Sequence, residues 1–230
     1  MYIEPFALPA SAAEARLAQQ NLREKLRLQN DFGQLHNVAG VDVGYLPAEN
    51  LAHASVVLMQ LEDFTVLEQV QAYITAEFPY VPGLLSFREI PAILAALKKL
   101  TRRPNMLMVD GQGIAHPRRM GIAAHLGLWL DVPSIGVAKS RLFGNFNMPG
   151  LKKGDRSPLL AGGECIGTVL RSRDNTNPLF ISPGHRVDVA TATEITLRCL
   201  TRYRLPEPTR LADKFSKCRC ANAAKRQILV

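Results

Sequence analysis

The chain has 230 residues, which is enough to bury a substantial apolar core within one domain. Lys and Arg number 28 against 20 Asp and Glu, so the formal net charge is +8, and 47% of the residues are hydrophobic. These values exclude a disordered chain, and the lack of any run of about 18 apolar residues excludes a membrane-spanning helix. A folded basic protein attracts polyanions, so nucleic acid is the leading partner class, with an anionic membrane or mere solubility as alternatives.

The first third of the chain predicts one helix and three strands. Residues 11–28 suit an exposed amphipathic helix, with Leu17, Leu22 and Leu26 as its apolar positions. Three β-rich segments follow, separated by turn-like stretches: residues 37–45, 53–61 and 65–75. Three consecutive strands predict an antiparallel meander.

Helices and buried strands then alternate. Helix-length periodicity over residues 84–100 and 118–130 is interleaved with apolar runs of strand length at 105–111 and 133–139. A meander followed by this alternation predicts an α/β fold in which helices cover both faces of a mixed sheet.

The last third predicts smaller elements. The expected strands and helices are residues 165–170, 178–182, 187–203 and a helix from about 209 onward. No internal repeat or low-complexity linker is visible. We therefore expect a single domain over residues 1–230, with an N-terminal helical flank over about 1–36 and a tail over about 218–230 that suits a flexible segment.

Two aspartates stand out against their surroundings. Asp42 interrupts the apolar strand VAGVDVGY, and Asp110 ends the apolar strand MLMVDG, where Gly111 allows a sharp turn. Ligands commonly bind at such strand ends in α/β sheets. For either residue alone, capping a turn is the simpler explanation, but two strands ending in this way weaken it.

Two further carboxylates have open interpretations. A helix through Glu89 would place it on an apolar stripe, yet Ser86 and Glu89 also have the spacing of a capping box, and Pro91 suits an early helical position. Asp213 can simply favour the positive end of a helix that opens near Thr209.

Convergence of these carboxylates would predict metal-dependent chemistry. Two such charges ~4 Å apart repel by about 4 kcal/mol at an effective dielectric of 20, and a bound cation relieves that repulsion. All-oxygen ligands suit Mg²⁺, with Mn²⁺ as a substitute, and such an ion activates water for phosphodiester hydrolysis.

The cysteines and the N-terminus bear on the compartment. Four cysteines late in the chain are too few for a disulfide framework, and MYIEPFALPA lacks a basic stretch followed by an apolar core. We expect a reducing, cytoplasmic location, no membrane partner and a monomer.

Several strings together resemble the endonuclease V family of ribonuclease H-like nucleases. The resemblance spans roughly residues 37–217 and rests on AGVDVGY around Asp42, FPYVPGLLSFRE (78–89), DGQGIAHPRRMGIAAHLG (110–127), GVAKSRL (136–142), SPGHRVD (182–188) and PEPTRLAD (206–213). It implies a DNA repair endonuclease that recognises deaminated adenine, hypoxanthine, and hydrolyses the second phosphodiester bond on its 3′ side. The products would carry 3′-hydroxyl and 5′-phosphate ends.

The resemblance also implies roles for individual residues. Asp42 and Asp110 would bind the metal directly, and Glu89 and Asp213 would act through waters or on a second ion; some members have His in place of Asp213. Tyr80 would be the wedge that separates the lesion from its neighbour, and Lys139 would contact a phosphate. Further contacts to DNA are implied for His116, Arg118 and Arg119, and the pocket for the flipped base for Gly83, Leu85, Gly111 and Gly121.

Two other hypotheses stay open. Inosine-containing RNA is an alternative substrate, because nothing in the sequence visibly senses a 2′-hydroxyl. A nucleic-acid-binding module without catalysis is the other, although the presence of Asp42, Glu89 and Asp110 argues against it.

Overall fold

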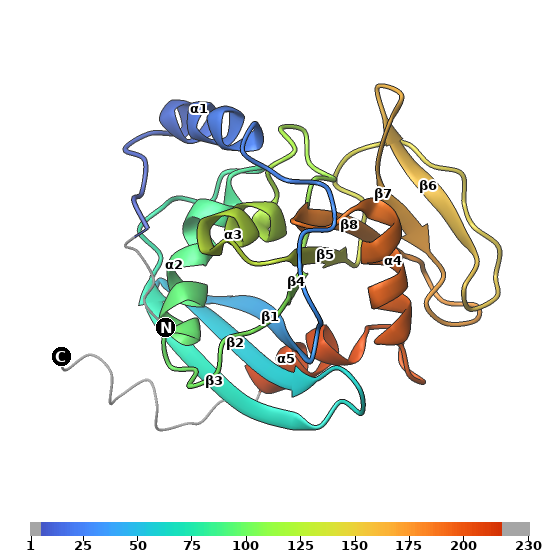
Figure 1. Ribbon diagram of the computed structural model, residues 1–230. Helices are drawn as coiled ribbons and strands as arrows, with labels where there is room; N and C mark the ends of the chain where they lie inside the picture. Colours follow the sequence, from blue (N-terminus) through green and yellow to red (C-terminus); the bar gives the residue numbers. More distant parts are fainter. Residues whose placement is uncertain (1–5, 218–230) are drawn as a thin grey trace.

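The computed structural model describes residues 6–217, which form one mixed sheet with helices on both faces (Figure 1). In chain order the strands are β1 (Asn37–Leu46), β2 (Leu51–Gln60), β3 (Val66–Thr75), β4 (Leu107–Asp110), β5 (Ser134–Ala138), β6 (Arg156–Ala161), β7 (Glu164–Leu170) and β8 (Leu179–His185). The helices are α1 (Ala12–Arg23), α2 (Leu85–Leu97), α3 (Ile122–Leu130), α4 (Val189–Arg198) and α5 (Glu207–Lys217).

The sheet has the order β3-β2-β1-β4-β5-β8-β7-β6. β1, β2 and β3 form the antiparallel meander, and β4 and β5 then run parallel to β1. The predicted α/β class and its mixed sheet are therefore confirmed. β8, β7 and β6 extend the sheet with antiparallel pairs.

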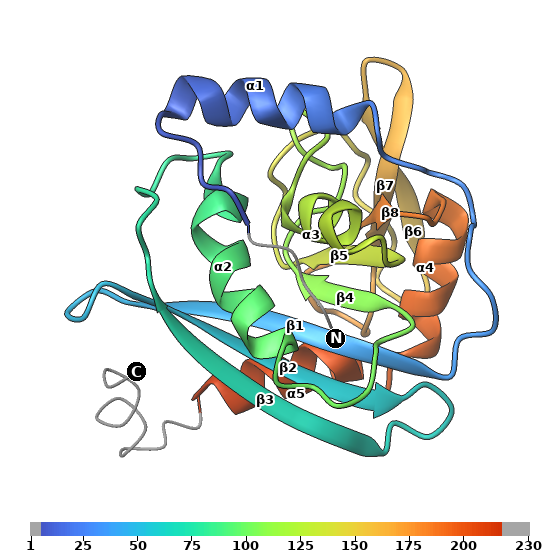
Figure 2. The same cartoon turned by 60° about the vertical axis from the view of Figure 1, so that its left-hand side comes forward.

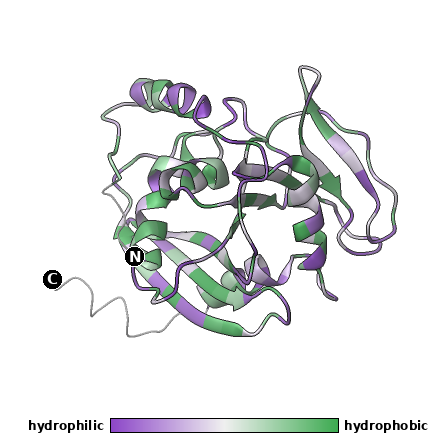
Figure 3. Ribbon diagram, viewed as in Figure 1, coloured by the Kyte–Doolittle hydropathy of each residue, from purple (hydrophilic) through white to green (hydrophobic). Residues whose placement is uncertain are grey.

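Two apolar layers hold the helices against the sheet. α2 and α3 pack on one face through a cluster that includes Val41, Leu58 and Val109. α4 and α5 pack on the opposite face through a cluster that includes Val38, Met108 and Val137. Figure 2 shows α2 and α3 on one side of the central strands and α5 on the other. In Figure 3 the central strands are largely apolar, whereas α1 alternates between apolar and polar residues.

Some element boundaries differ from the predicted ones. α3 begins at Ile122 rather than 118, because the segment before it forms a turn in which Arg119 has a φ of 58°. β6 was not predicted, since it is an edge strand in which Leu159 is the one buried residue and Pro158 interrupts the apolar pattern. Residues 218–230, where we expect a flexible tail, lie outside the described part of the chain.

α1 agrees only in part with the predicted apolar face, because Leu22 and Leu26 pack against a core cluster and Leu17 does not. It begins after Ser11, whose side chain accepts a hydrogen bond from the Glu14 N–H, and it ends at Arg23. The side chain of Leu17, predicted to be on the apolar stripe, is 57% exposed, whereas Ala15 and Gln19 are buried. Among residues 6–217, no helix is long and apolar enough to cross a membrane.

Candidate active site

The strand register brings Asp42 and Asp110 together. β1 and β4 are parallel with Val41 opposite Val109, so the next residue of each strand, Asp42 and Asp110, also lie side by side. Side chains alternate between the faces of a strand, and Val41 and Val109 point toward α2 and α3. The two aspartates therefore point toward the opposite face, which α5 covers.

α5 delivers a third carboxylate because its start lies unusually close to β1. A Cβ atom on Gly40 would stand 1.9 Å from the carbonyl oxygen of Pro208, so only a glycine permits this approach. One ligand atom from each of Asp42, Asp110 and Asp213 lies within 4.8 Å of the other two. The carboxylates are thus close enough to share one ion, which is the condition on which the metal hypothesis depends.

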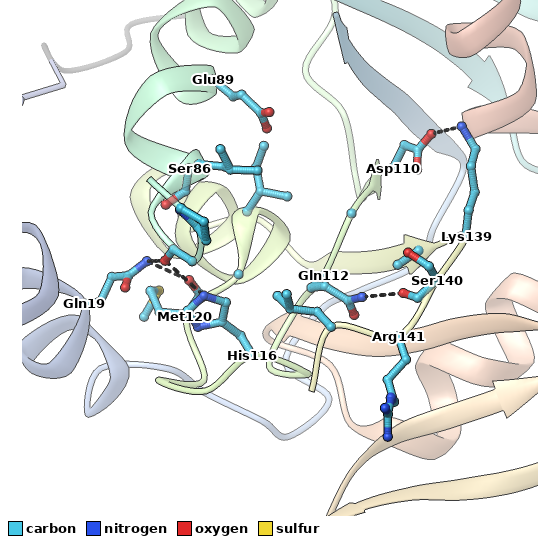
Figure 4. Close-up of a pocket in the computed structure, with 18 of the residues that line it drawn as sticks. Gln19, Ser86, Glu89, Asp110, Gln112, His116, Met120, Lys139, Ser140 and Arg141 are labelled. Atoms are coloured by element: carbon cyan, nitrogen blue, oxygen red, sulfur yellow. Dashed lines mark hydrogen bonds and ion pairs between the residues drawn. The ribbon is translucent and has the colours of Figure 1, made fainter. Parts of the chain in front are cut away.

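Lys139 adds a positive charge to this cluster. It follows β5 directly, and its ammonium lies 2.5 Å from Oδ2 of Asp110 and 3.2 Å from Oδ1 of Asp213. Burial alone would lower the pKa of Lys139, but hydrogen bonds to the two carboxylates raise it above its usual value. Burial raises the pKa of Asp110, with Lys139 opposing and Asp42 reinforcing the shift. Figure 4 shows Asp110 and Lys139 facing each other.

Glu89 approaches the cluster from the other face of the sheet. It lies on α2, and its side chain is directed toward Asp110 in Figure 4. Burial and, next, the charge of Asp42 raise its pKa to about 7. The capping-box explanation for Glu89 is wrong, because the N-cap of α2 is Leu84 and Ser86 instead hydrogen-bonds to Nδ1 of His125 at 3.0 Å. Pro91 likewise lies inside the helix rather than in its first turn.

The donor set fits a hard divalent cation. Carboxylate oxygens are the ligands that Mg²⁺ and Mn²⁺ prefer, and a cation would offset the mutual repulsion of three half-buried acids. The three residues that the structure groups around one position are Asp42, Asp110 and Asp213, and Glu89, which was also expected at the metal site, is not in this group.

A pocket of about 450 Å³ opens beside the carboxylates. Asp110, Glu89 and Lys139 border it on the side of the acidic cluster. The four residues expected to form a base pocket, Gly83, Leu85, Gly111 and Gly121, all line it. Tyr80 lies at its rim with 68% of its surface exposed, as a side chain that enters a nucleic-acid helix requires.

His116 and Arg118 form the frame of this pocket rather than free side chains at its mouth. Arg118 N–H donates to Nδ1 of His116 at 3.1 Å, so the neutral ring carries its proton on Nε2 and donates it to the Gly83 carbonyl at 3.0 Å. Burial, with the charge of Arg118 next, lowers the pKa of His116 to about 4. Gly83 has a φ of 77°, and a Cβ there would lie 2.9 Å from the Arg118 guanidinium.

Arg119 is also engaged by the protein. Its guanidinium hydrogen-bonds to Oε2 of Glu164 at 2.8 and 2.9 Å and to the His116 carbonyl at 3.2 Å. Of the residues expected to touch DNA, three are therefore held in hydrogen bonds within the protein: His116, Arg118 and Arg119.

Three residues near the site were missed from the sequence. Lys217 lies 2.6 Å from Oδ2 of Asp213, and their spacing of four residues on a helix was a usable signal. Gln19 lines the pocket from α1, where it stands four residues after the buried Ala15. Arg204 donates to the Lys139 carbonyl at 3.0 Å, and no pattern in the sequence indicates that contact.

A mixed α/β sheet with carboxylates side by side in the middle of β1 and at the end of β4, and a third on α5, defines a nuclease of the ribonuclease H-like class. Within that class the family model described as Endonuclease V matches residues 20–214. The chain belongs to the endonuclease V family, and the resemblance inferred from the sequence is confirmed.

Individual relatives agree with this assignment. Endonuclease V of Alkalilimnicola ehrlichii is 51% identical over 222 residues, which are 96% of this chain and 97% of the relative. The crystal structure of endonuclease V from Streptomyces avermitilis superposes with a TM-score of 0.87 at 41% identity, covering 96% of each chain. A Ciona intestinalis endonuclease V, solved with a 23mer DNA that contains an inosine followed by a ribo-adenosine, has a TM-score of 0.78 at 29% identity and covers 89% of this chain and 94% of its own.

Proposed function

We propose that this nuclease recognises hypoxanthine in DNA and hydrolyses the second phosphodiester bond on its 3′ side, leaving 3′-hydroxyl and 5′-phosphate ends, as a step of DNA repair. The observation that carries the proposal is the position of the pocket, which shares Asp110 with the acidic cluster and is also lined by Glu89 and by Lys139, the ion-pair partner of Asp110. A base held in the pocket therefore keeps its own strand beside the carboxylates. The Ciona complex with inosine-containing DNA supports the choice of lesion.

The protein's own groups divide the work. Asp42, Asp110 and Asp213 would hold a divalent cation, with Mg²⁺ as the expected ion and Mn²⁺ as a substitute, and Glu89 would act through water. When bound, that cation supplies a nucleophilic hydroxide and stabilises negative charge on the phosphoryl oxygens. Lys139 would orient the phosphate, and Tyr80 would fill the space that the flipped base leaves. His116, Arg118 and Arg119 would contribute to nucleic-acid binding indirectly, because they fix the shape of the pocket.

The test compares matched DNA and RNA oligonucleotides, each with and without one inosine, incubated with Mg²⁺ or with a chelator. We expect inosine-dependent, Mg²⁺-dependent cleavage of DNA at a single position, with a 5′-phosphate on the downstream product. Cleavage in the chelator, or release of a free base, would contradict the proposal. Stronger cleavage of the RNA would favour the alternative of an inosine-specific endoribonuclease, and binding without cleavage would favour a non-catalytic module.

A further inference from the structure

A second, smaller pocket adjoins the one proposed for the lesion. It has a volume of about 280 Å³ and is lined by residues of β1, β2 and α2, together with Tyr80. Three residues line both pockets: Tyr80, Leu85 and Glu89. These residues therefore separate the two pockets, and Tyr80, the proposed wedge, stands at their boundary.

The second pocket contains two planar groups that are stacked on each other. Tyr45 is 42% exposed, and Cζ of Arg88 lies 4.0 Å from the centroid of its ring. Nη1 of Arg88 donates a hydrogen bond to the Phe78 carbonyl at 3.3 Å, and the Tyr45 hydroxyl donates to Oδ1 of Asn50 at 2.7 Å. The protein thus holds both groups in place. Aromatic rings and guanidinium planes are the groups on which unstacked nucleobases pack.

The second pocket also lies beside the carboxylates. Gly44 lines it and follows Asp42 by two residues on β1, which is about 7 Å along the strand. Glu89, whose side chain is directed toward Asp110 in Figure 4, lines it as well. A group bound in the second pocket is therefore close to the lesion pocket and to the acidic cluster at the same time.

The proposed reaction has one nucleotide that needs such a position. Hydrolysis of the second phosphodiester bond on the 3′ side leaves a single nucleotide between the lesion and the cleaved bond. When the wedge separates the lesion from this neighbour, the neighbouring base loses a stacking partner. Its base must then lie beside Tyr80 and its backbone beside the carboxylates, and the second pocket meets both conditions.

Building on the proposed function, we propose that the second pocket binds the base of the nucleotide on the 3′ side of the lesion, and that this base stacks on the Arg88 guanidinium, which Tyr45 supports from behind. The bound base fixes the path of the strand between the lesion and the cleaved bond. Every nucleobase has a π-face, so the pocket accepts any base at this position. Arg88 is a positioning residue in this account and does not touch the reacting phosphate.

The experiment uses three duplexes that each carry one inosine. The first has normal neighbours, the second has an abasic residue on the 3′ side of the inosine, and the third has one on the 5′ side. Both abasic duplexes lack one base pair, so the third controls for the lost pairing.

The proteins compared are wild type, Arg88→Met and Arg88→Lys, the last of which keeps the charge without the planar group. Arg202→Met is the matched control, because the Arg202 guanidinium also lies over a ring, that of Tyr203 at 5.0 Å, but lines neither pocket. All reactions run well below the melting temperature of each variant.

For wild type we expect kcat/KM on the 3′-abasic duplex to be about tenfold below that on the 5′-abasic duplex. Both Arg88 variants should lose about tenfold on the duplex with normal neighbours and should cleave the two abasic duplexes equally well, because the stacking contact is already absent. Arg202→Met should match wild type on all three duplexes.

Three results would overturn the inference. Arg88 variants that are weaker but keep the wild-type preference between the abasic duplexes would leave Arg88 with a structural role alone. Full activity of Arg88→Lys would show that charge, and not the planar group, is what matters. A wild type that is more sensitive to the missing base on the 5′ side would place another nucleotide in the pocket. Failure of the wild type to cleave the inosine duplex with normal neighbours would instead overturn the proposed function.

Discussion

At the scale of one residue, the burial of Glu89 beside other acids lowers the stability of the folded protein when its carboxyl group is ionised. Burial and the charge of Asp42 raise its pKa to about 7, whereas the ordinary pKa of a glutamate, which applies in an unfolded chain, is 4.5. Between these values the folded protein binds more protons than the unfolded one, so stability is full below pH 4.5 and falls as the pH rises through 7.

Glu89→Gln should therefore stabilise the metal-free protein at high pH. In chelator at pH 8 we expect a gain of about 1–3 kcal/mol in the free energy of unfolding over wild type, and near-equality at pH 4.5. Urea denaturation across this range measures the difference. The exposed Glu77, replaced by Gln, serves as control and should leave the pH profile of wild type unchanged. If the free energy of unfolding depended on pH in the same way in wild type and Glu89→Gln, ionisation of Glu89 would not destabilise the folded protein.

Asp110 differs from Glu89 in being central to the acidic cluster. Asp110→Asn keeps the shape of the side chain but removes one of the three carboxylates and the ion pair with Lys139 at 2.5 Å. Because a neutral amide is a poor ligand for Mg²⁺, we expect cleavage to fall by about 10² or more, while binding of inosine-containing DNA is retained. A gel-shift titration and a cleavage time course on the same duplex separate the two effects. Parallel losses of binding and cleavage would argue that Asp110 positions the nucleic acid instead.

At the scale of elements, the approach of α5 to β1 decides whether Asp213 reaches the cluster. Gly40→Ala would place a methyl group 1.9 Å from the backbone oxygen of Pro208, and no side-chain rotation relieves a clash with backbone. We expect a loss of about 1–3 kcal/mol in stability, as for other overpacked cores, and a larger loss of cleavage because Asp213 moves away. Gly44→Ala, on the same strand with nothing within 4 Å of its added Cβ, is the control for stability. Equal melting temperatures for the two variants would contradict this account.

The elements also show what the sequence allowed us to predict. Asp42 and Asp110 were identified because a charge in an apolar strand is a local anomaly, and parallel neighbours then place such residues together. The position of α5 was not predictable in the same way, since the contact between Gly40 and Pro208 joins residues far apart in the chain. The sequence around Asp213 was explained equally well by a metal ligand and by an acid that favours the positive end of a helix.

Gln19 and β6 were missed for a related reason. The leucines of α1 suggested an apolar stripe through Leu17, but Leu17 is exposed and the buried residues of the helix are Ala15 and the polar Gln19. β6 is held to the sheet mainly by its backbone pairing with β7 and buries one side chain, Leu159. Neither feature leaves an apolar period in the sequence, which is the signal that such predictions depend on.

At the scale of the whole molecule, the net charge is +8, and the basic pairs that contribute to it differ in how the protein engages them. The predicted basic pair at the pocket, Arg118 and Arg119, is committed to contacts within the protein. Three other pairs are exposed: Lys98–Lys99, Arg102–Arg103 and Lys152–Lys153. Lys99 and Lys153 each donate a hydrogen bond to a backbone carbonyl but keep their charge at the surface. The described basic pairs thus divide between one that is engaged by the protein beside the pocket and three that are exposed, where their charge would act on a polyanion at longer range. The pair Lys225–Arg226 lies outside the described residues.

The salt dependence of binding measures how many phosphates the basic side chains contact. Each neutralised phosphate releases counterions, so four contacts would give a slope of log K against log salt of about −3.6, or a loss of affinity of about 10² between 50 and 200 mM salt. Fluorescence anisotropy with duplex DNA in chelator gives this slope without cleavage. If Lys139, which is 41% exposed, contacts a phosphate, Lys139→Met should make the slope shallower by about 1, because one cationic contact fewer displaces counterions. A flat response in the wild type would mean that the basic surface does not carry the binding, and an unchanged slope in the variant would mean that Lys139 serves only to hold Asp110 and Asp213 in place.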